Sequence, residues 1–183
     1  YQILLALLTR LNPLRFLKKF APVMGFAFST ATSNATIPMN IDTLEEKIGV
    51  NRRISSFTIP LGATINMDGT SIMQGVAVVF IAQAYGIALT PMDYVTVIAT
   101  ATLASIGTAG VPSVGLVTLS MVLTSVGLPI EGIGFIMGID RILDMSRTAV
   151  NITGDAVCTT IVANQNQALD KEVFNKKEAE LEA

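Results

Sequence analysis

An uncharged run of about 37 residues, Tyr94–Ile130, is the feature that most constrains the fold of this 183-residue chain. It contains no Asp, Glu, Lys or Arg, and it exceeds the roughly 20 apolar residues that cross a bilayer as one helix. Near its centre, Ser105-Ile-Gly-Thr-Ala-Gly-Val-Pro-Ser-Val-Gly115 carries three glycines and a proline, which a regular helix does not accommodate. The first arm, Tyr94–Ala104, would be only ~16 Å long. The run therefore predicts a hairpin that enters and leaves a bilayer on one side, because two full spans would need longer arms.

The composition also favours a membrane protein. Apolar residues make up 51% of the chain and charged residues 14%, whereas about a quarter of a soluble domain is charged. The net charge of −2 excludes the strongly basic surface that binds nucleic acid. The lack of histidine excludes a metal site or a catalytic triad that depends on histidine. The single cysteine, Cys158, excludes a disulfide within the chain. No nucleophile–base set is available, so we expect that the protein is not an enzyme.

A second hairpin is predicted nearer the start of the chain, over residues 12–50. Its apolar part, Phe20–Phe28, runs into the small polar stretch Ser29–Thr36, and charged residues flank both ends. Each arm is too short for a span, which is typical of a re-entrant hairpin, although this segment alone fits a soluble loop equally well. Residues 1–11 are expected to end an upstream transmembrane helix, because Tyr1–Leu8 is also too short for a span. The chain is therefore interpreted as the C-terminal part of a larger protein.

Residues 51–89 are predicted to form a broken transmembrane helix. They are largely apolar except near the start and in the middle, where Asn66-Met-Asp-Gly-Thr70 interrupts them, and Asp and Gly both disfavour a helix interior. Unwound backbone at membrane depth is tolerated only where it lines a cavity or is covered by protein. We expect the re-entrant hairpin of the uncharged run over 90–127, a long polar-faced transmembrane helix over 128–163, and a solvated, partly helical cytoplasmic tail over 164–183. The fold class is thus an all-α membrane protein.

The basic residues predict the orientation of the hairpins. Lysines and arginines flank the first hairpin and occur in the tail, whereas Thr90–Asp93 and Thr124–Glu131 at the base of the second have none. By the positive-inside rule, the first hairpin enters from the cytoplasm and the second from outside the cell membrane. Two like elements of opposite orientation indicate an inverted repeat, with a binding site where their tips meet near the midplane.

The segment Gly138–Asp155 reads as a helix with one strongly polar face. At about 100° per residue, its polar side chains fall within an arc of roughly 100°. In a soluble helix this face would be solvated. In a membrane helix it would be costly, and such residues mark a substrate or ion path. The face comprises Asp140, Asp144, Arg147, Thr148, Asn151 and Asp155.

Three motifs together resemble the dicarboxylate/amino acid:cation symporters, and most of all the sodium-coupled glutamate/aspartate transporters. They are Asn66-Met-Asp-Gly-Thr70, Ser105-Ile-Gly-Thr-Ala-Gly-Val-Pro112 and Asp144-Met-Ser-Arg-Thr-Ala-Val-Asn-Ile-Thr-Gly-Asp155. The resemblance covers essentially the whole chain. It implies an elevator-type symporter for L-aspartate or L-glutamate that works as a homotrimer through scaffold helices outside this sequence, with this chain supplying most of the moving transport domain.

The resemblance also implies a substrate site. Arg147 would bind the side-chain carboxylate through its planar fork, or else form a structural pair with Asp144 or Asp140. Asp144 would accept the substrate ammonium, which favours an amino acid over a dicarboxylate without an amine. The first tip, Ala31-Thr-Ser-Asn-Ala35, departs from the serine runs of many members, so the acidic substrate depends on Arg147 alone. The full set is Ser33, Thr70, the backbone N–H groups of Val111 and Gly115, Asp144, Arg147, Thr148 and Asn151.

Sodium is the expected co-transported ion, and hard oxygen ligands suit it. By resemblance, Asp155, Asn66, Asn151 and the carbonyl of Gly62 form one site. Asp68 and Asn66 belong to a second site, whose other ligands lie on an upstream helix. A third site uses the carbonyls of Thr64, Ser105, Ile106 and Thr108 and closes the second tip. Asp140 is expected to support the fold.

Several alternatives stay open at this point. Within the same class, the chain could belong to a proton-coupled symporter or a C4-dicarboxylate carrier. From other classes, it could form an anion-conducting pore, or bind ligand without transporting it.

Overall fold

The computed structural model describes residues 1–106, 110 and 112–176, and the regular structure of these residues is helical apart from one isolated bridge between Val50 and Leu169. The helices are α1 (Gln2–Thr9), α2 (Pro13–Thr30), α3 (Ser33–Thr43), the π-helix η1 (Leu44–Ile48), α4 (Arg52–Ile65), α5 (Asp68–Ala84), α6 (Pro91–Ser105), α7 (Val114–Ser125), the 3₁₀ turn η2 (Ile130–Gly132), α8 (Ile133–Met137), α9 (Asp140–Gln165) and α10 (Lys171–Asn175). The expected all-α fold class is confirmed for this part of the chain.

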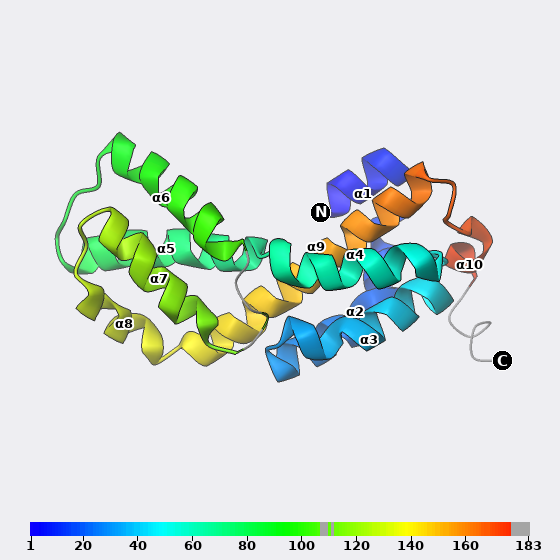
Figure 1. The fold of residues 1–183 in the computed structure, drawn as a ribbon, viewed down its shortest axis with the longest axis horizontal. Coiled ribbons are helices and arrows are strands. Elements are labelled where there is room, and N and C mark those ends of the chain that lie inside the picture. The colour runs from blue at the N-terminus through cyan, green and yellow to red at the C-terminus, as the bar shows by residue number, and fades with distance from the viewer. Residues whose placement is uncertain (107–109, 111, 177–183) are drawn as a thin grey trace.

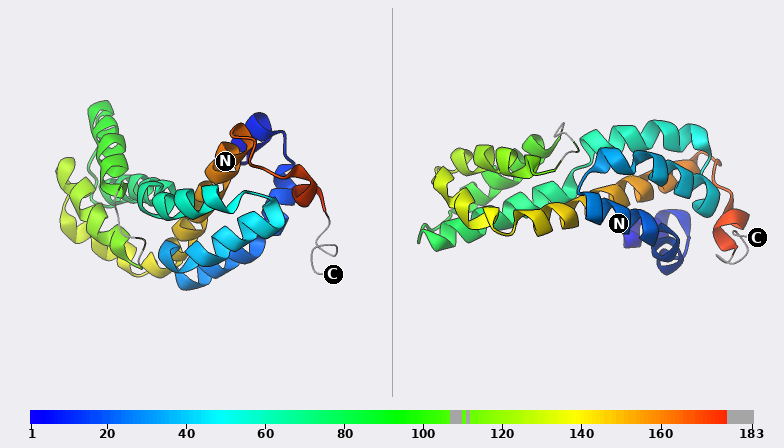
Figure 2. Two further views of the ribbon diagram at one scale, coloured as in Figure 1. Left: turned by 45° about the vertical axis from the view of Figure 1, so that its right-hand side comes forward. Right: turned by 90° about the horizontal axis from the view of Figure 1, so that it is seen from below.

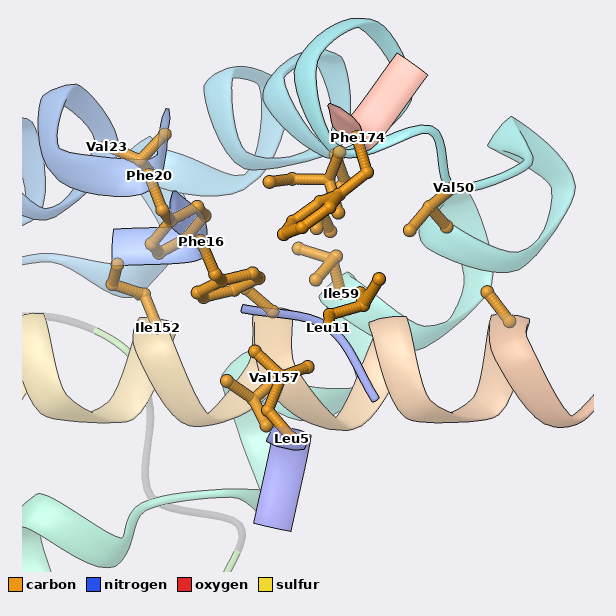
Figure 3. Close-up of a cluster of buried hydrophobic side chains, with 14 of the residues drawn as sticks. Leu5, Leu11, Phe16, Phe20, Val23, Val50, Ile59, Ile152, Val157 and Phe174 are labelled. Carbon is orange, nitrogen blue, oxygen red and sulfur yellow. The ribbon is translucent and has the colours of Figure 1, made fainter. Parts of the chain in front are cut away.

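The molecule has two lobes with separate apolar cores. Figure 1 shows α5 to α8 at one end, α1 to α4 and α10 at the other, and α9 running from one lobe into the other. The first core packs α1, α2, α4, α9 and α10 together around Phe16, Phe20 and Ile59 (Figure 3). The second packs α5, α6 and α7 around Val78, Leu119 and Leu123. The polar residues of the chain's motifs lie between these two cores.

The first hairpin consists of α2 and α3. Asn12 caps α2 by accepting hydrogen bonds from the backbone N–H groups of Leu14 and Arg15, and Pro13 follows at the first helical position. The helix ends at Ala31, which has a left-handed φ of 53°, and α3 begins two residues later. The turn is therefore shorter than the expected polar tip, most of which is helical.

The helix over residues 51–89 is interrupted inside the expected motif. α4 ends at Ile65 and α5 begins at Asp68, so Asn66 and Met67 form the break, and the two helices lie end to end (Figure 1). Within the described residues, Arg52–Ala84 taken through this break is the one helix long and apolar enough to cross a membrane.

The second hairpin has the short arms expected from the sequence. α6 has 15 residues and α7 has 12, which correspond to about 22 Å and 18 Å. α6 begins with a capping box, in which the side chains of Thr90 and Asp93 each accept a hydrogen bond from the other residue's backbone N–H. The two views of Figure 2 show this hairpin beside α5, and the second core contains side chains of all three helices.

The final helix differs from the prediction. The expected continuous helix over 128–163 is divided into η2, α8 and α9. Gly132, Gly134 and Gly138 occur within seven residues, and glycine weakens a helix interior. Gly132 also packs closely on Ile81. A Cβ atom added to Gly132 would lie 2.5 Å from Cγ2 of Ile81, so a larger residue would clash there. The polar helix itself begins at Asp140.

The tail also differs from the prediction, because it is not solvated throughout. Ala168 and Asp170 pair with the backbone of Asn51 and Gly49 through hydrogen bonds of 3.0 and 2.8 Å. Phe174 of α10 is 1% exposed and belongs to the first core (Figure 3). The buried ammonium of Lys19 donates to the carbonyls of Lys47 and Val173 and lies 5.5 Å from the centre of the Phe174 ring. Residues 168–175 therefore close one end of this lobe, and the tail is partly helical as expected.

The burial of Phe174 predicts that α10 contributes to stability. We expect Phe174→Ala to lower the free energy of unfolding by about 3–5 kcal/mol, because it leaves a cavity in a packed core. Denaturation of the purified protein measures this. Lys171→Ala on the exposed side of the same helix is the control and should change it by less than about 0.5 kcal/mol. Equal effects of the two substitutions would contradict the docking of α10.

Candidate functional site

The polar face of α9 points into the molecule. Asp140, Asp144, Arg147, Thr148, Asn151 and Asp155 are each 6% exposed or less, whereas Ile139 and Ile142 on the other side are 52% and 63% exposed. The polar side of this helix is buried and its apolar side is exposed, which is the reverse of a helix on the surface of a soluble protein. The helix that carries these residues, α9, runs from one lobe into the other (Figure 1). The predicted alignment of the polar residues on one side of the helix is confirmed.

A buried ion pair lies at the centre of this face. Arg147 donates from Nε to Asp144 Oδ1 at 2.8 Å and also from Nη2 to the same oxygen. Its Nη1 donates to Thr70 Oγ1 on α5 at 2.9 Å. The backbone N–H of Ser113 donates to the other oxygen of Asp144 at 2.8 Å. The pair therefore connects α9 with α5 and with the second tip, and the structural pairing of Arg147 with Asp144 is what this structure shows.

The two hairpin tips contact each other beside the ion pair. Thr32 Oγ1 of the first tip donates to the carbonyl of Gly110 in the second at 2.6 Å, and the backbone N–H of Asn34 donates to the same carbonyl at 3.4 Å. Gly115 packs on the Arg147 guanidinium, where an added Cβ would lie 2.8 Å from Cζ. The expected meeting of the tips is thus confirmed for the described residues.

Among the described residues, a cavity of about 10 Å³ lies between the tips and α9. Four predicted substrate residues line it, and the space is about that of one water molecule. An amino acid or dicarboxylate therefore fits only after a tip has moved. The lining residues are Ala31, Ser33, Met67, Gly110, Val114, Arg147, Thr148 and Asn151. Of the other predicted residues, Thr70, Gly115 and Asp144 contact Arg147, and Val111 lies outside the described residues.

The residues of the first predicted sodium site lie together at the break between α4 and α5. Asn66 Nδ2 donates to Asp155 Oδ1 at 2.9 Å and to the Asn151 carbonyl at 3.3 Å. Gly62 packs against Asp155, where an added Cβ would lie 2.7 Å from the carboxylate carbon. The other oxygen, Asp155 Oδ2, is buried and has no hydrogen-bond partner among the described residues. A buried carboxylate oxygen without a donor is a place where a cation would be stabilised.

The side chain of Asn151 contacts the break between α4 and α5. Its side-chain oxygen accepts from the backbone N–H of Gly69 at 2.8 Å, and its Nδ2 lies 3.2 Å from the sulfur of Met67. The side chain therefore holds the first turn of α5 against α9, while its backbone carbonyl faces Asn66.

Tyr1 is a contact of the second predicted sodium site that the sequence did not reveal. Its hydroxyl donates to the Asp68 carboxylate and lies 3.3 Å from Asn66 Oδ1. The Tyr1 ring also covers Gly154 of α9. A single tyrosine at the end of an apolar segment carries no periodic signal, and the partners are separated by 65 or more residues. The structure thus places the hydroxyl oxygen of Tyr1, the residue before α1, beside the residues of this predicted site.

The third predicted set is only partly brought together. Ser105 and Ile106 line a cavity of about 350 Å³ that Asp68 and Ser71 also line. Ser71 Oγ donates to Ser105 Oγ at 2.7 Å. Thr64 is not among the lining residues, and Thr108 lies outside the described part of the chain.

The residues of the three predicted cation sites offer mainly oxygen atoms as ligands. Among the residues that the structure describes, no three His, Cys, Asp or Glu side chains cluster as metal ligands. A cation here would therefore depend on one carboxylate together with amide, hydroxyl and backbone oxygens, which are ligands for hard cations.

Comparisons with known proteins give one consistent result. The sequence model of the sodium:dicarboxylate symporter family matches residues 1–165. The chain is 48% identical over 160 residues to an excitatory amino acid transporter of Caenorhabditis elegans, covering 87% of this chain and 32% of that protein. It is 46% identical over 154 residues to human excitatory amino acid transporter 2, covering 84% and 27%. It is 43% identical over 163 residues to human neutral amino acid transporter A, covering 89% and 31%. The chain thus spans about a third of the length of these relatives.

The close approach of Gly62 to Asp155 generates a prediction. We expect Gly62→Ala to lower the free energy of unfolding by about 1–3 kcal/mol, because the new Cβ pushes against the Asp155 carboxylate and α9. Gly75→Ala, in α5 with nothing within 4 Å of its added Cβ, should instead raise it by roughly 0.5–1 kcal/mol through helix propensity. Thermal denaturation of both variants decides this. A neutral Gly62→Ala would show that α4 and α9 have room for a side chain here.

Proposed function

Because the chain belongs to the sodium:dicarboxylate symporter family, we propose that it forms part of a membrane transporter that carries an acidic amino acid, L-aspartate or L-glutamate, together with sodium. The observation that carries the substrate class is the buried Arg147 beside a cavity between two hairpin tips. A guanidinium binds a carboxylate through two parallel hydrogen bonds. The names of several relatives, excitatory amino acid transporters, agree with such a substrate.

The ion pair suggests how binding would proceed. In the structure Arg147 and Asp144 neutralise each other out of water. An acidic amino acid brings a side-chain carboxylate and an ammonium group. The carboxylate would replace Asp144 on Arg147, and Asp144 would accept the ammonium. Two ion pairs then take the place of one, and the α-carboxylate is the one remaining charge that other donors have to stabilise.

The α-carboxylate and the remaining contacts would come from residues around the cavity. Ser33, Thr70, Thr148 and Asn151 offer hydroxyl or amide groups, and the backbone N–H groups of Val111 and Gly115 complete the set. The cavity of about 10 Å³ has to widen first. The short hydrogen bond from Thr32 to Gly110 is one contact that such an opening breaks.

Sodium would bind as a second cargo at the break between α4 and α5. We assign one ion to Asp155, Asn66, the Asn151 carbonyl and the Gly62 carbonyl, and the unpartnered Asp155 Oδ2 supports this assignment. A second ion would use Asp68 and Asn66. A third would use the carbonyls of Thr64, Ser105, Ile106 and Thr108 beneath the second tip. Asn66 contacts Asp155 and Asn151 of α9 directly. Ion binding would therefore stabilise the packing of the α4–α5 break against α9, the helix that carries most of the proposed substrate residues.

The proposed setting is the cell membrane, plasma or inner. α2–α3 and α6–α7 would be re-entrant hairpins, α4–α5 a broken span and α9 a polar-faced span, with boundaries near 11, 50, 89, 127 and 163. The lengths of α6 and α7 support this, because neither arm reaches across a hydrocarbon core of roughly 30 Å. The tail would be cytoplasmic. The whole protein would be a homotrimer that moves this part as an elevator against scaffold helices outside the chain.

A binding experiment on the purified full-length protein tests the proposal. Thermal stability is measured with L-aspartate, L-glutamate, succinate and L-serine, each in sodium and in potassium. We expect an acidic amino acid to raise the melting temperature in sodium only, and Arg147→Ala to abolish that shift. Arg147→Lys keeps the charge but lacks the planar fork, so it should weaken binding by about tenfold or more.

The other outcomes identify the alternatives. Stabilisation by succinate alone would indicate a C4-dicarboxylate carrier. An equal shift in potassium that depends on pH would indicate proton coupling, and a shift with L-serine that survives Arg147→Ala would indicate a neutral substrate. Current through reconstituted protein without substrate would indicate an anion pore.

A further inference from the structure

An exposed arginine, Arg141, stands at the start of the polar helix α9. Its side chain is exposed, whereas those of Asp140, Asp144 and Arg147 on the same helix are buried. Among the described residues, Arg141 forms no ion pair, and its one hydrogen bond runs from Nη2 to the carbonyl of Ser29 at 3.4 Å. A guanidinium has five N–H donors, so most of the hydrogen-bonding capacity of Arg141 is left for a ligand.

The position of Arg141 relates it to the cavity between the hairpin tips. Its partner Ser29 lies in the last turn of α2, two residues before Ala31, which lines that cavity. Thr148 also lines the cavity and follows Arg141 by seven residues, so the two side chains leave α9 on the same side, about 10 Å apart along the helix. Figure 1 shows the start of α9 near the turn between α2 and α3. The exposed guanidinium therefore lies about two helical turns from the cavity.

The segments around Arg141 carry few other charges. The chain has no Asp, Glu, Lys or Arg over residues 20–41 and 94–130, which contain the two tips. The Asp140 carboxylate is 5% exposed, so an approaching ligand meets the guanidinium and not this carboxylate. Asp68, at the α4–α5 break, lines a different cavity. An anion that comes to the tips therefore meets Arg141 as an exposed positive charge.

The membrane setting gives this exposure a meaning. Arg141 lies within the proposed span over residues 128–163, and a guanidinium that faces hydrocarbon is costly, so an exposed arginine at this depth has to face water or protein. A water-filled approach with apolar walls concentrates the field of a single charge and raises the local concentration of oppositely charged ligands. Such an exposed charge changes mainly the association rate of a ligand and its salt dependence.

We propose that Arg141 is an outer contact for the carboxylate of an acidic substrate, which it attracts to the tips before the substrate reaches Arg147. This role rests on the proposed function, because it concerns the same substrate and the same cavity. Arg141 raises the rate at which an anion arrives. Arg147 is the residue that holds the carboxylate once the tips have opened.

The test is the rate at which radiolabelled L-aspartate binds to the purified full-length protein in a neutral detergent. Sodium is kept constant while choline chloride raises the ionic strength. We expect Arg141→Gln to lower the association rate constant about threefold to tenfold at low ionic strength, with an unchanged dissociation rate constant. The difference from wild type should shrink as salt screens the attraction. Arg141→Lys retains the charge and should behave like wild type.

A matched control removes a different exposed arginine. Arg53, at the start of α4, is exposed and follows Asn51, whose backbone N–H is bonded to Ala168 of the tail. Arg53→Gln changes the net charge by the same amount as Arg141→Gln. It should leave the association rate and its salt dependence unchanged, because Arg53 does not lie near the tips.

A second experiment changes the charge at one position without changing the fold. Arg141→Cys is made in a background in which Cys158, an exposed thiol, and any other accessible cysteine of the full-length protein are replaced. The new thiol is then modified with a methanethiosulfonate reagent that carries either a trimethylammonium or a sulfonate group. We expect the cationic group to restore fast association and the anionic group to slow it further.

The outcomes separate this proposal from the proposed function. Failure of wild type to bind L-aspartate, L-glutamate or succinate overturns both. If wild type binds, an unchanged association rate in Arg141→Gln overturns the role of Arg141 alone. A change that salt does not affect, or equal effects of the two thiol reagents, shows that Arg141 only holds the first hairpin through Ser29 and overturns that role too. Faster dissociation with unchanged association, or no reaction of the new thiol, does the same.

Discussion

The centre of the molecule depends on the ion pair between Asp144 and Arg147. Both side chains are almost fully buried, and a charge in such a place is stable only when it is paired and its other hydrogen-bonding positions are filled. Thr70 fills one position on Arg147, and the backbone N–H of Ser113 fills one on Asp144. These two contacts bring α5 and the second hairpin to α9. The need of this one ion pair for hydrogen-bond partners therefore determines where α9, α5 and the second hairpin meet.

The two apolar cores make this polar centre possible. Each lobe has its own cluster of buried aliphatic and aromatic side chains, and α9 contributes polar residues where it passes from one lobe into the other. The break at Asn66 and Met67 lies at the same level, where α4 ends and α5 begins. The carboxyl end of α4 carries partial negative charge and the amino end of α5 partial positive charge. The backbone thus offers both signs of charge within two residues.

The sequence predicted the parts of the fold that follow from local patterns. The period of Asp144, Arg147 and Asn151 identified the inward face of α9. The Asp–Gly pair at residues 68 and 69 indicated a break, which lies just before the pair, because α5 begins at Asp68. The sequence did not predict contacts that depend on distant residues. Phe174 stands in a charged tail without any periodic pattern, and it is buried because Lys19 and the first core lie beside it. Tyr1 reaches Asp68 in the same way, through tertiary packing that no local propensity encodes.

The small cavity between the described parts of the hairpin tips has a thermodynamic consequence for the proposed site. A ligand there would bind only to a conformation in which the tips are apart, so its observed association constant would be the constant for that conformation multiplied by the population of that conformation. Substitutions in the Thr32–Gly110 contact therefore change affinity without touching the ligand. A weaker tip contact increases the competent population and tightens apparent binding up to the limit at which the open conformation predominates. Selectivity among ligands, by contrast, stays with the residues of the open site.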